Sequence, residues 1–151
     1  MTLELGRENR SRPPFKYSAV TRVGFSDTDA QGVVYYGRYL PYFDLARVEY
    51  HRHLGLAAGA GGAEYVMRAL AVESHAPARF DDTLEVFARA SRIGRTSVTF
   101  EHAAYLADSD TLLVTASQTA VLVDLEARRP CPIPEGYRLA VRAFEGEDLV
   151  E

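Results

Sequence analysis

The sequence predicts an α+β domain in which an antiparallel, curved sheet of about five strands wraps around one long helix. One segment repeats apolar and aromatic residues at helical spacing, and four later segments read as strands separated by short turns. Strands joined by tight turns pair antiparallel, and a helix and such a sheet bury their apolar faces against each other. A chain of 151 residues suffices for one domain. We therefore treat 1–151 as a single domain, with 1–15 as a flexible N-terminal extension.

The first strand and the helix come early in the chain. Residues 17–25, "YSAVTRVGF", follow Pro13 and Pro14 and form the first expected strand. Residues 38–54 form the expected helix, because apolar and aromatic positions recur at steps of three and four. Gly55 is placed to end this helix.

The remaining elements are four expected strands and a short helix. The strands cover residues 65–75, 83–92, 97–107 and 112–125, and turn-forming sequences such as "IGRT" and "DSDT" separate them. A short helix is expected at 137–143. Strands of about ten residues are about 33 Å long, which is enough to enclose the whole helix. Long edge strands need to be covered, and pairing in a symmetric dimer would cover them.

Composition excludes several classes of protein. The formal net charge of −4 gives no electrostatic reason to expect a nucleic-acid partner. The single cysteine, Cys131, cannot form an intrachain disulfide, so we expect a cytoplasmic protein. No uncharged apolar run approaches 18 residues, so no membrane partner is expected. The four histidines show no metal-ligand spacing, and no metal site is predicted.

The stretch "DTDAQGVVYY", residues 27–36, suggests a catalytic site. Acidic residues are poor strand formers, yet Asp27 and Asp29 stand just before an apolar run and the helix. Backbone N–H groups near Tyr36, at the helix start, lack intrahelical partners and stabilise negative charge. Gly32 lets the chain fold back, so the Asp29 carboxylate and these amides could act on one carbonyl, as acyl transfer requires. The alternative is that these aspartates serve only as turn and cap residues.

Two chemical roles are open for Asp29. The carboxylate could attack the carbonyl directly and form a mixed anhydride, or it could take a proton from an attacking water. An unperturbed aspartate has a pKa of about 3.9 and is a weak base at pH 7, so the second role would benefit from burial.

The stretch "DTDAQGVVYYGRYLPYFDLAR", from Asp27 to Arg47, resembles the signature of the 4-hydroxybenzoyl-CoA thioesterase family almost throughout. "PARFDD" at 77–82, "SRIGRTS" at 91–97 and "RRPCPIPE" at 128–135 resemble the family at their expected places. The resemblance implies a hotdog fold, a catalytic Asp29 and a thioester carbonyl polarised by the backbone N–H of Tyr36. Many relatives carry histidine at the position of Tyr36.

The resemblance also implies further site residues. It assigns Gly32 and Val33 to the substrate-binding loop, and Asp44 could reach a polar group on an aromatic acyl chain. The favoured alternative for Asp44 is an ion pair with Arg47 at i, i+3.

Arg92 and Arg95 flank the glycine turn "RIGR". They could bind the phosphates of coenzyme A or phosphopantetheine, or they could be basic residues of a solvated turn.

The predicted function is hydrolysis of an acyl-CoA thioester to a free acid and coenzyme A, with no cofactor because coenzyme A belongs to the substrate. The subunits are expected to form a homodimer or homotetramer with sites at the interface. One alternative is a thioesterase acting on an acyl-carrier protein, which presents the same phosphopantetheine arm. Another is a non-catalytic acyl-CoA-binding module, which would not need Asp29. A hotdog dehydratase is disfavoured, because no histidine lies between Lys16 and Tyr50.

Overall fold

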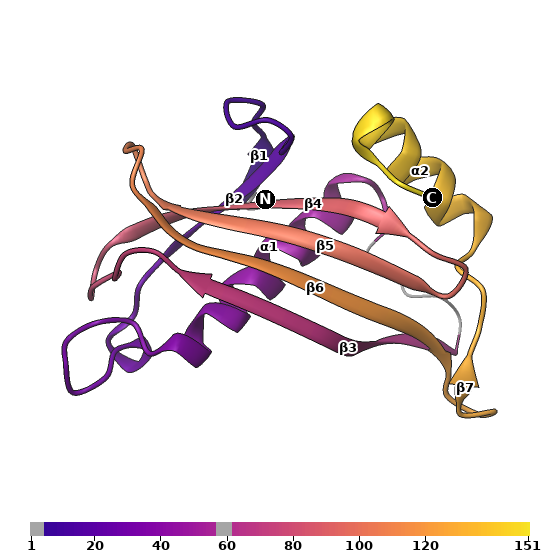
Figure 1. Cartoon of the computed structure of the whole chain (residues 1–151), viewed down its shortest axis with the longest axis horizontal. Helices are drawn as coiled ribbons and strands as arrows, with labels where there is room; N and C mark the ends of the chain where they lie inside the picture. Colours follow the sequence, from indigo (N-terminus) through magenta and orange to yellow (C-terminus); the bar gives the residue numbers. More distant parts are fainter. Residues whose placement is uncertain (1–4, 57–61) are drawn as a thin grey trace, which may run out of the picture.

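A computed structural model describes residues 5–56 and 62–151, which form one sheet with a long helix against one of its faces (Figure 1). The described residues contain seven strands, all paired antiparallel, in the order β1-β2-β4-β5-β6-β3, with β7 also on β6. The strands are β1 Gly6–Glu8, β2 Tyr17–Arg22, β3 Ala63–Ser74, β4 Thr83–Ile93, β5 Ser97–Leu106, β6 Leu112–Asp124 and β7 Arg129–Pro130. The helices are α1 Tyr39–His53 and α2 Glu135–Glu145, with 3₁₀ turns η1 Phe25–Asp27, η2 Tyr36–Arg38 and η3 Gly146–Asp148.

The predicted α+β class, the helix and the five main strands are confirmed, but the first strand ends at Arg22 rather than at residue 25, and the number of strands differs. The sheet has seven strands rather than about five, because β1 and β7 were not predicted. β7 is only two residues long. β1 lies in the segment expected to be a flexible extension, and its residues Gly6–Glu8 pair with β2. Residues 1–4 of that extension lie outside the described part of the chain.

The helix α1 ends as its sequence predicts. Gly55 adopts a φ of 75°, a left-handed conformation that favours glycine. The N–H groups of Gly55 and Leu56 then donate to the carbonyls of Arg52 and His51, at 3.1 and 2.7 Å. This closes the last turn with hydrogen bonds to otherwise unpaired carbonyls.

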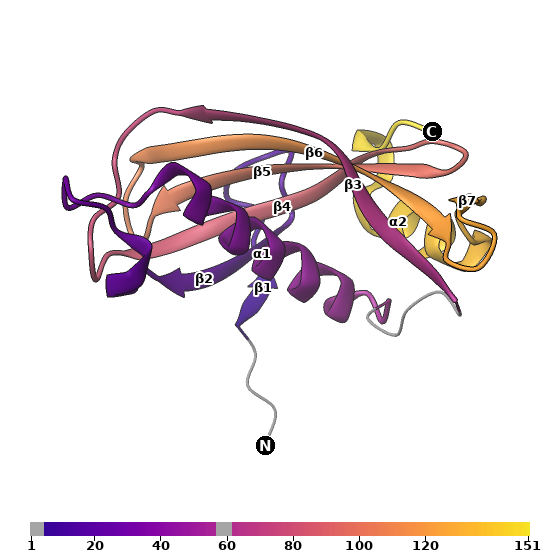
Figure 2. The same ribbon diagram turned by 90° about the horizontal axis from the view of Figure 1, so that it is seen from below.

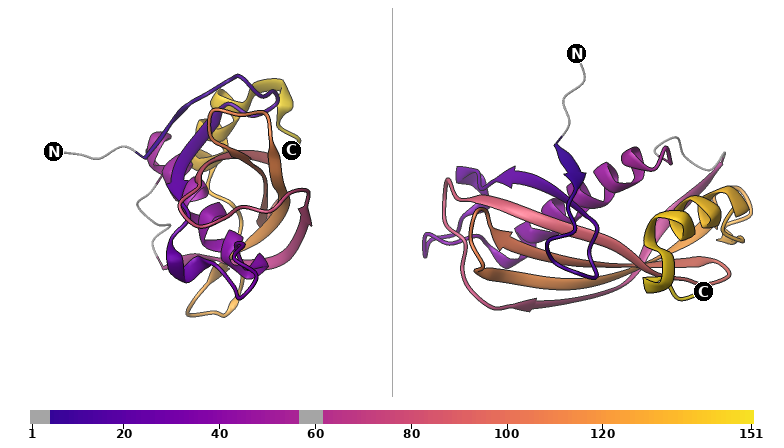
Figure 3. Two further views of the ribbon diagram at one scale, coloured as in Figure 1. Left: turned by 90° about the vertical axis from the view of Figure 1, so that its left-hand side faces the viewer. Right: turned by 90° about the horizontal axis from the view of Figure 1, so that it is seen from above.

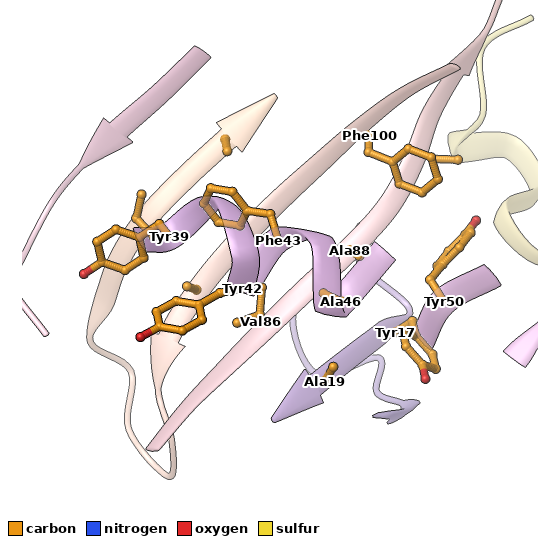
Figure 4. Packing of buried hydrophobic residues seen from close by; sticks show 14 of the residues in the cluster. Tyr17, Ala19, Tyr39, Tyr42, Phe43, Ala46, Tyr50, Val86, Ala88 and Phe100 are labelled. Atoms are coloured by element: carbon orange, nitrogen blue, oxygen red, sulfur yellow. The ribbon is translucent and has the colours of Figure 1, made fainter. Parts of the chain in front are cut away.

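One face of α1 forms the centre of the core (Figures 2 and 4). α1 lies closest to β4 and β2, and Phe43, Ala46 and Tyr50 are fully buried against them and β5. Their neighbours from the sheet are small or branched residues, which leave room for the aromatic rings: Ala19, Val86, Ala88 and Ala90. The tight packing fixes the axis of α1, and with it the position of the helix start.

The edge strand β3 is not covered by the helix. Its side chains on the helix-facing side of the sheet are apolar and exposed; they are Tyr65, Met67, Leu70 and Val72. These residues pair across the ladder with β6 residues that are buried. An edge strand of 12 residues with an exposed apolar face is a surface on which another chain would pack.

The two ends of the sheet carry different elements. The loops around η1 and η2 gather at one end, and α2 and the C-terminus lie at the other (Figures 1 and 3). No helix in the described ranges combines the length and the apolar composition required to cross a bilayer.

Candidate active site

The segment from Thr28 to Val34 forms a short hairpin in front of the helix. Thr28 and Val34 form an antiparallel bridge, and the N–H of Asp29 donates to the carbonyl of Val33 at 2.9 Å. The N–H of Gly32 donates back to the carbonyl of Asp29 at 3.0 Å. Gly32 has a φ of 78°, so this β-turn with a left-handed last residue requires glycine there. The expectation that Gly32 reverses the chain is confirmed.

Asp29 stands at the first position of this turn and is half-buried. Its Oδ1 accepts a hydrogen bond from the N–H of Gln31 at 2.8 Å, the usual side-chain bond of an aspartate in a turn. Within the described residues, no donor binds its other oxygen, Oδ2. The turn role considered from the sequence is therefore present, and it leaves one carboxylate oxygen available for chemistry.

Tyr36 is the first residue of η2, which continues directly into α1. Tyr36 is 73% exposed, and its ring lies against the ring of Tyr35 at a tilt of 39°, with the ring centroids 4.4 Å apart. In the part of the chain that the structure describes, the backbone N–H of Tyr36 has no acceptor. An unpaired amide at a helix start is the donor that an oxyanion needs.

Asp27 differs from Asp29 in its surroundings, a difference that the sequence alone does not reveal. Its Oδ2 accepts hydrogen bonds from the N–H of Gly24 at 2.9 Å and from the hydroxyl of Tyr42 at 2.7 Å. Its Oδ1 lies 3.7 Å from Nε of Arg38. The partner Tyr42 comes from the first turns of α1, fifteen positions along the chain. Asp27 is thus a structural carboxylate, whereas Asp29 has one oxygen to which no other described residue donates a hydrogen bond.

Asp44 forms the ion pair that was favoured from the sequence. Its Oδ1 lies 2.9 Å from Nη2 of Arg47, whose Nη1 donates to Oε1 of Gln118 at 3.1 Å. The same oxygen of Gln118 lies 2.9 Å from Nε2 of the buried His102. Asp44 is eight residues after Tyr36, about 12 Å along the helix. Asp44 therefore lies about two helical turns beyond the amide of Tyr36, where it is paired with Arg47.

Arg92 and Arg95 lie far from Asp29 in one chain. The end of β2 is beside the start of β4, because Arg22 pairs with Thr83. Arg92 is near the other end of the 11-residue β4, nine residues after Thr83 and about 30 Å away. The two arginines therefore do not join the hairpin within a single subunit.

A cavity of about 200 Å³ opens between α1, α2 and the sheet. Asp29 and Tyr36 are not among its lining residues, which include Arg47, His51, Tyr65, Phe100 and Tyr137. Burial, and then the charge of Arg47, lower the pKa of His51 to about 4, so this imidazole is neutral at pH 7. Its Nε2 lies 2.7 Å from the hydroxyl of Tyr137. Among the described residues, no cluster of acidic residues, histidine and cysteine could hold a metal ion.

Comparison with known proteins identifies the family. The model of the thioesterase-like superfamily matches residues 23–141. The acyl-CoA thioester hydrolase YbgC of Escherichia coli is 38% identical over 117 residues, 76% of this chain and 87% of that protein. The acyl-CoA thioesterase YbgC of Haemophilus influenzae is 33% identical over 128 residues, 82% of this chain and 93% of that protein. The 1,4-dihydroxy-2-naphthoyl-CoA thioesterase of Synechocystis superposes with a TM-score of 0.75 at 23% identity, covering 82% of this chain and 93% of that chain.

The chain belongs to the thioesterase-like superfamily. The resemblance to the 4-hydroxybenzoyl-CoA thioesterase family and the hotdog fold expected from it are confirmed. The class of the protein is that of the thioester hydrolases.

Proposed function

We propose that this protein hydrolyses an acyl-CoA thioester, with Asp29 as the catalytic carboxylate and the N–H of Tyr36 as the donor to the thioester oxygen. The observation that carries the proposal is that one short hairpin joins two groups that have no hydrogen-bond partner among the described residues: an oxygen of the Asp29 carboxylate and the amide at the helix start. The N–H of Gln31 holds the Asp29 carboxylate at 2.8 Å, and the amide of Tyr36 belongs to the backbone of η2. Such preorganisation is the main source of catalytic power in acyl transfer.

The geometry is compatible with two routes. In the first, Oδ2 of Asp29 attacks the carbonyl carbon and the C–S bond breaks. Coenzyme A leaves as the thiolate and takes a proton from solvent, and water then hydrolyses the mixed anhydride to the free acid and restores the Asp29 carboxylate. In the second, Oδ2 accepts a proton from a water molecule that attacks the carbonyl; the C–S bond then breaks, and the protonated carboxyl group returns the proton to the leaving thiolate. In both routes the negative charge that develops on the carbonyl oxygen is stabilised by the N–H of Tyr36.

We further propose that the active form is an oligomer in which β3 of one subunit pairs with β3 of another. The exposed apolar side chains of β3 support this assembly. A single chain leaves Asp29 half-exposed, so the partner would complete the acyl pocket around it. Arg92 and Arg95 remain candidates for binding the coenzyme A phosphates. Because they lie far from Asp29 of their own chain, they would bind the substrate of a site whose Asp29 belongs to another subunit.

Two other functions are kept as alternatives. A thioesterase acting on an acyl-carrier protein would use the same hairpin, since both carriers end in phosphopantetheine. A non-catalytic acyl-CoA-binding module would keep the helix start and would tolerate loss of the Asp29 carboxylate. The resemblance to enzymes named acyl-CoA thioester hydrolases favours acyl-CoA hydrolysis.

The test is a hydrolysis screen over short, long, branched and aryl acyl-CoAs, with thiol release as the readout. Asp29→Asn should lower turnover by several orders of magnitude while acyl-CoA binding persists. Asp108→Asn is the matched control, because Asp108 is an exposed turn aspartate in another loop. Equal turnover in wild type and Asp29→Asn would exclude a catalytic Asp29, and absence of hydrolysis by the wild type would favour the binding module.

A further inference from the structure

We propose that Asp27 and Tyr42 are positioning residues that fix the hairpin of Asp29 onto the first turns of α1, and so align the carboxylate with the amide of Tyr36. This inference rests on the proposed function. It assigns different tasks to the two aspartates of the "DTD" sequence.

The carboxylate of Asp27 connects three parts of the site. Oδ2 receives the N–H of Gly24, which precedes η1, and the hydroxyl of Tyr42, which belongs to α1. Oδ1 faces Nε of Arg38 at the end of η2. With these three donors around it, the Asp27 carboxylate has a structural task and is poorly placed to attack a substrate.

The backbone of Asp27 forms the base of the hairpin. Its carbonyl accepts the N–H of Tyr35 at 2.9 Å, and its N–H donates to the carbonyl of Gly24 at 3.0 Å. Asp29 is two residues beyond this base on one strand, and Tyr36 follows the base on the other. Any shift of Asp27 relative to the helix therefore moves the candidate nucleophile relative to the candidate oxyanion donor.

Tyr42 gives this connection a rigid point of attachment. Its side chain is only 6% exposed and packs edge-to-face on Tyr39, with ring centroids 5.8 Å apart. Burial, together with its hydrogen bond to Asp27, raises the pKa of Tyr42 well above its usual value. The phenol therefore remains a hydrogen-bond donor to Asp27 throughout the pH range of an assay.

The hairpin has a second support that is independent of Tyr42. Val33 forms a bridge with Arg79, and the N–H of Val34 donates to the carbonyl of Ala78 at 2.8 Å. The hairpin should therefore stay folded when the Tyr42 hydroxyl is removed, while its alignment with the helix start becomes looser. A misplacement of about 1 Å can lower a reaction rate about 100-fold.

The experiment compares Tyr42→Phe with Tyr50→Phe. Tyr50 is a matched control, because it lies two turns further along α1, is buried, and donates its hydroxyl to Oε2 of Glu145 at 2.6 Å. Both variants remove one hydroxyl from a tyrosine–carboxylate pair in the core, but only Tyr42 faces the hairpin. The measurements are kcat, KM and the melting temperature with an acyl-CoA that the wild type hydrolyses.

The expected result separates alignment from stability. Tyr42→Phe should lower kcat by about 10- to 100-fold with KM within about twofold. Tyr50→Phe should lower the melting temperature at least as much and keep kcat within about twofold. Asp27→Asn should also lower kcat, and the Asp27→Asn/Tyr42→Phe double variant should lose less than the product of the two single losses, because both act through one contact.

The proposal is overturned if folded Tyr42→Phe keeps the wild-type kcat, or if Tyr42→Phe and Tyr50→Phe lose kcat in proportion to their loss of stability. If Tyr42→Phe does not fold, kcat of Asp27→Asn is measured instead, because this variant keeps an acceptor for the N–H of Gly24. A folded Asp27→Asn enzyme with the wild-type kcat would then overturn the proposal. A wild type without hydrolysis overturns the proposed function as well. A wild type with normal hydrolysis and an unaffected Tyr42→Phe overturns only the positioning role.

Discussion

Replacing Tyr36 by proline should remove the oxyanion donor without disturbing the fold. Proline is well accepted at the first position of a helix, where the missing N–H has no intrahelical acceptor. The preceding residue, Tyr35, has φ −63° and ψ 132°, an extended conformation that a following proline requires. Because the backbone N–H of Tyr36 has no acceptor among the described residues, the substitution breaks no backbone hydrogen bond; it removes only the exposed ring and its hydroxyl contact with Tyr35.

The loss of activity can be estimated from the loss of one donor. Removing one donor to an oxyanion raises the barrier by about 2.7–4 kcal/mol, which lowers kcat about 10²- to 10³-fold. The side chain is 73% exposed, so its removal should change the free energy of unfolding by roughly 0.5 kcal/mol or less. Activity and stability should therefore separate in this variant.

The assay is thiol release from an acyl-CoA at saturating substrate, with the melting temperature measured in parallel. Tyr36→His and Tyr36→Ala are the controls, because both keep the backbone N–H and change only the exposed side chain. They should retain kcat within a few fold of the wild type. A Tyr36→Pro enzyme that matches these controls would show that the amide does not bind the developing oxyanion, and the proposed mechanism would lose one of its two parts.

Three further results are expected. Gly32→Ala should destabilise the hairpin by roughly 1–2 kcal/mol, because the φ of 78° at this position strains any L side chain, and it should also lower kcat. Melting curves measure the loss of stability, and Gly136→Ala, in α2, is the control. Leu70→Lys, on the exposed face of β3, should reduce the oligomeric state measured by light scattering, and an unchanged state would argue against pairing through β3. Burial lowers the pKa of His102 to about 4. As the pH falls below about 6.5, this histidine is therefore protonated in the unfolded protein but not in the folded protein, which favours unfolding. The wild type should thus lose about 2 kcal/mol more stability than His102→Gln between pH 7 and pH 5, as urea unfolding can measure; an equal loss would contradict the burial argument.

The long elements could be predicted because their sequences are periodic, and the short ones could not. Residues 38–54 were predicted to be helical, and α1 with its preceding 3₁₀ turn covers almost this range. The strand Gly6–Glu8 has no apolar alternation, and it exists because it pairs with β2. Whether such a short strand forms therefore depends on contacts between distant segments and not on local propensity.

The turn that carries the candidate site could be predicted from the sequence, but the side-chain hydrogen bonds that attach this turn to the helix could not. The spacing of Asp29, Gly32 and the helix start predicted a turn that faces the first amides of the helix. The role of Asp27 depends on Tyr42, and the sequence does not tell which tyrosine of a helix turns towards a given loop. The separation of Arg92 from the hairpin follows from the pairing of β2 with β4, which joins strands that are not consecutive in the chain.

The exposure of Asp29 in a single chain also bears on how the site works. A carboxylate in contact with water is a weak base at neutral pH, and the oxyanion donor is strongest where water is excluded. A second subunit that covered the hairpin would exclude water, which would strengthen the carboxylate as a base and the amide as an oxyanion donor. The uncovered apolar face of β3 provides a surface for that subunit. We therefore expect catalysis to depend on assembly, so that variants such as Leu70→Lys should lose activity and oligomeric state together, even though Leu70 belongs to an edge strand and not to the hairpin.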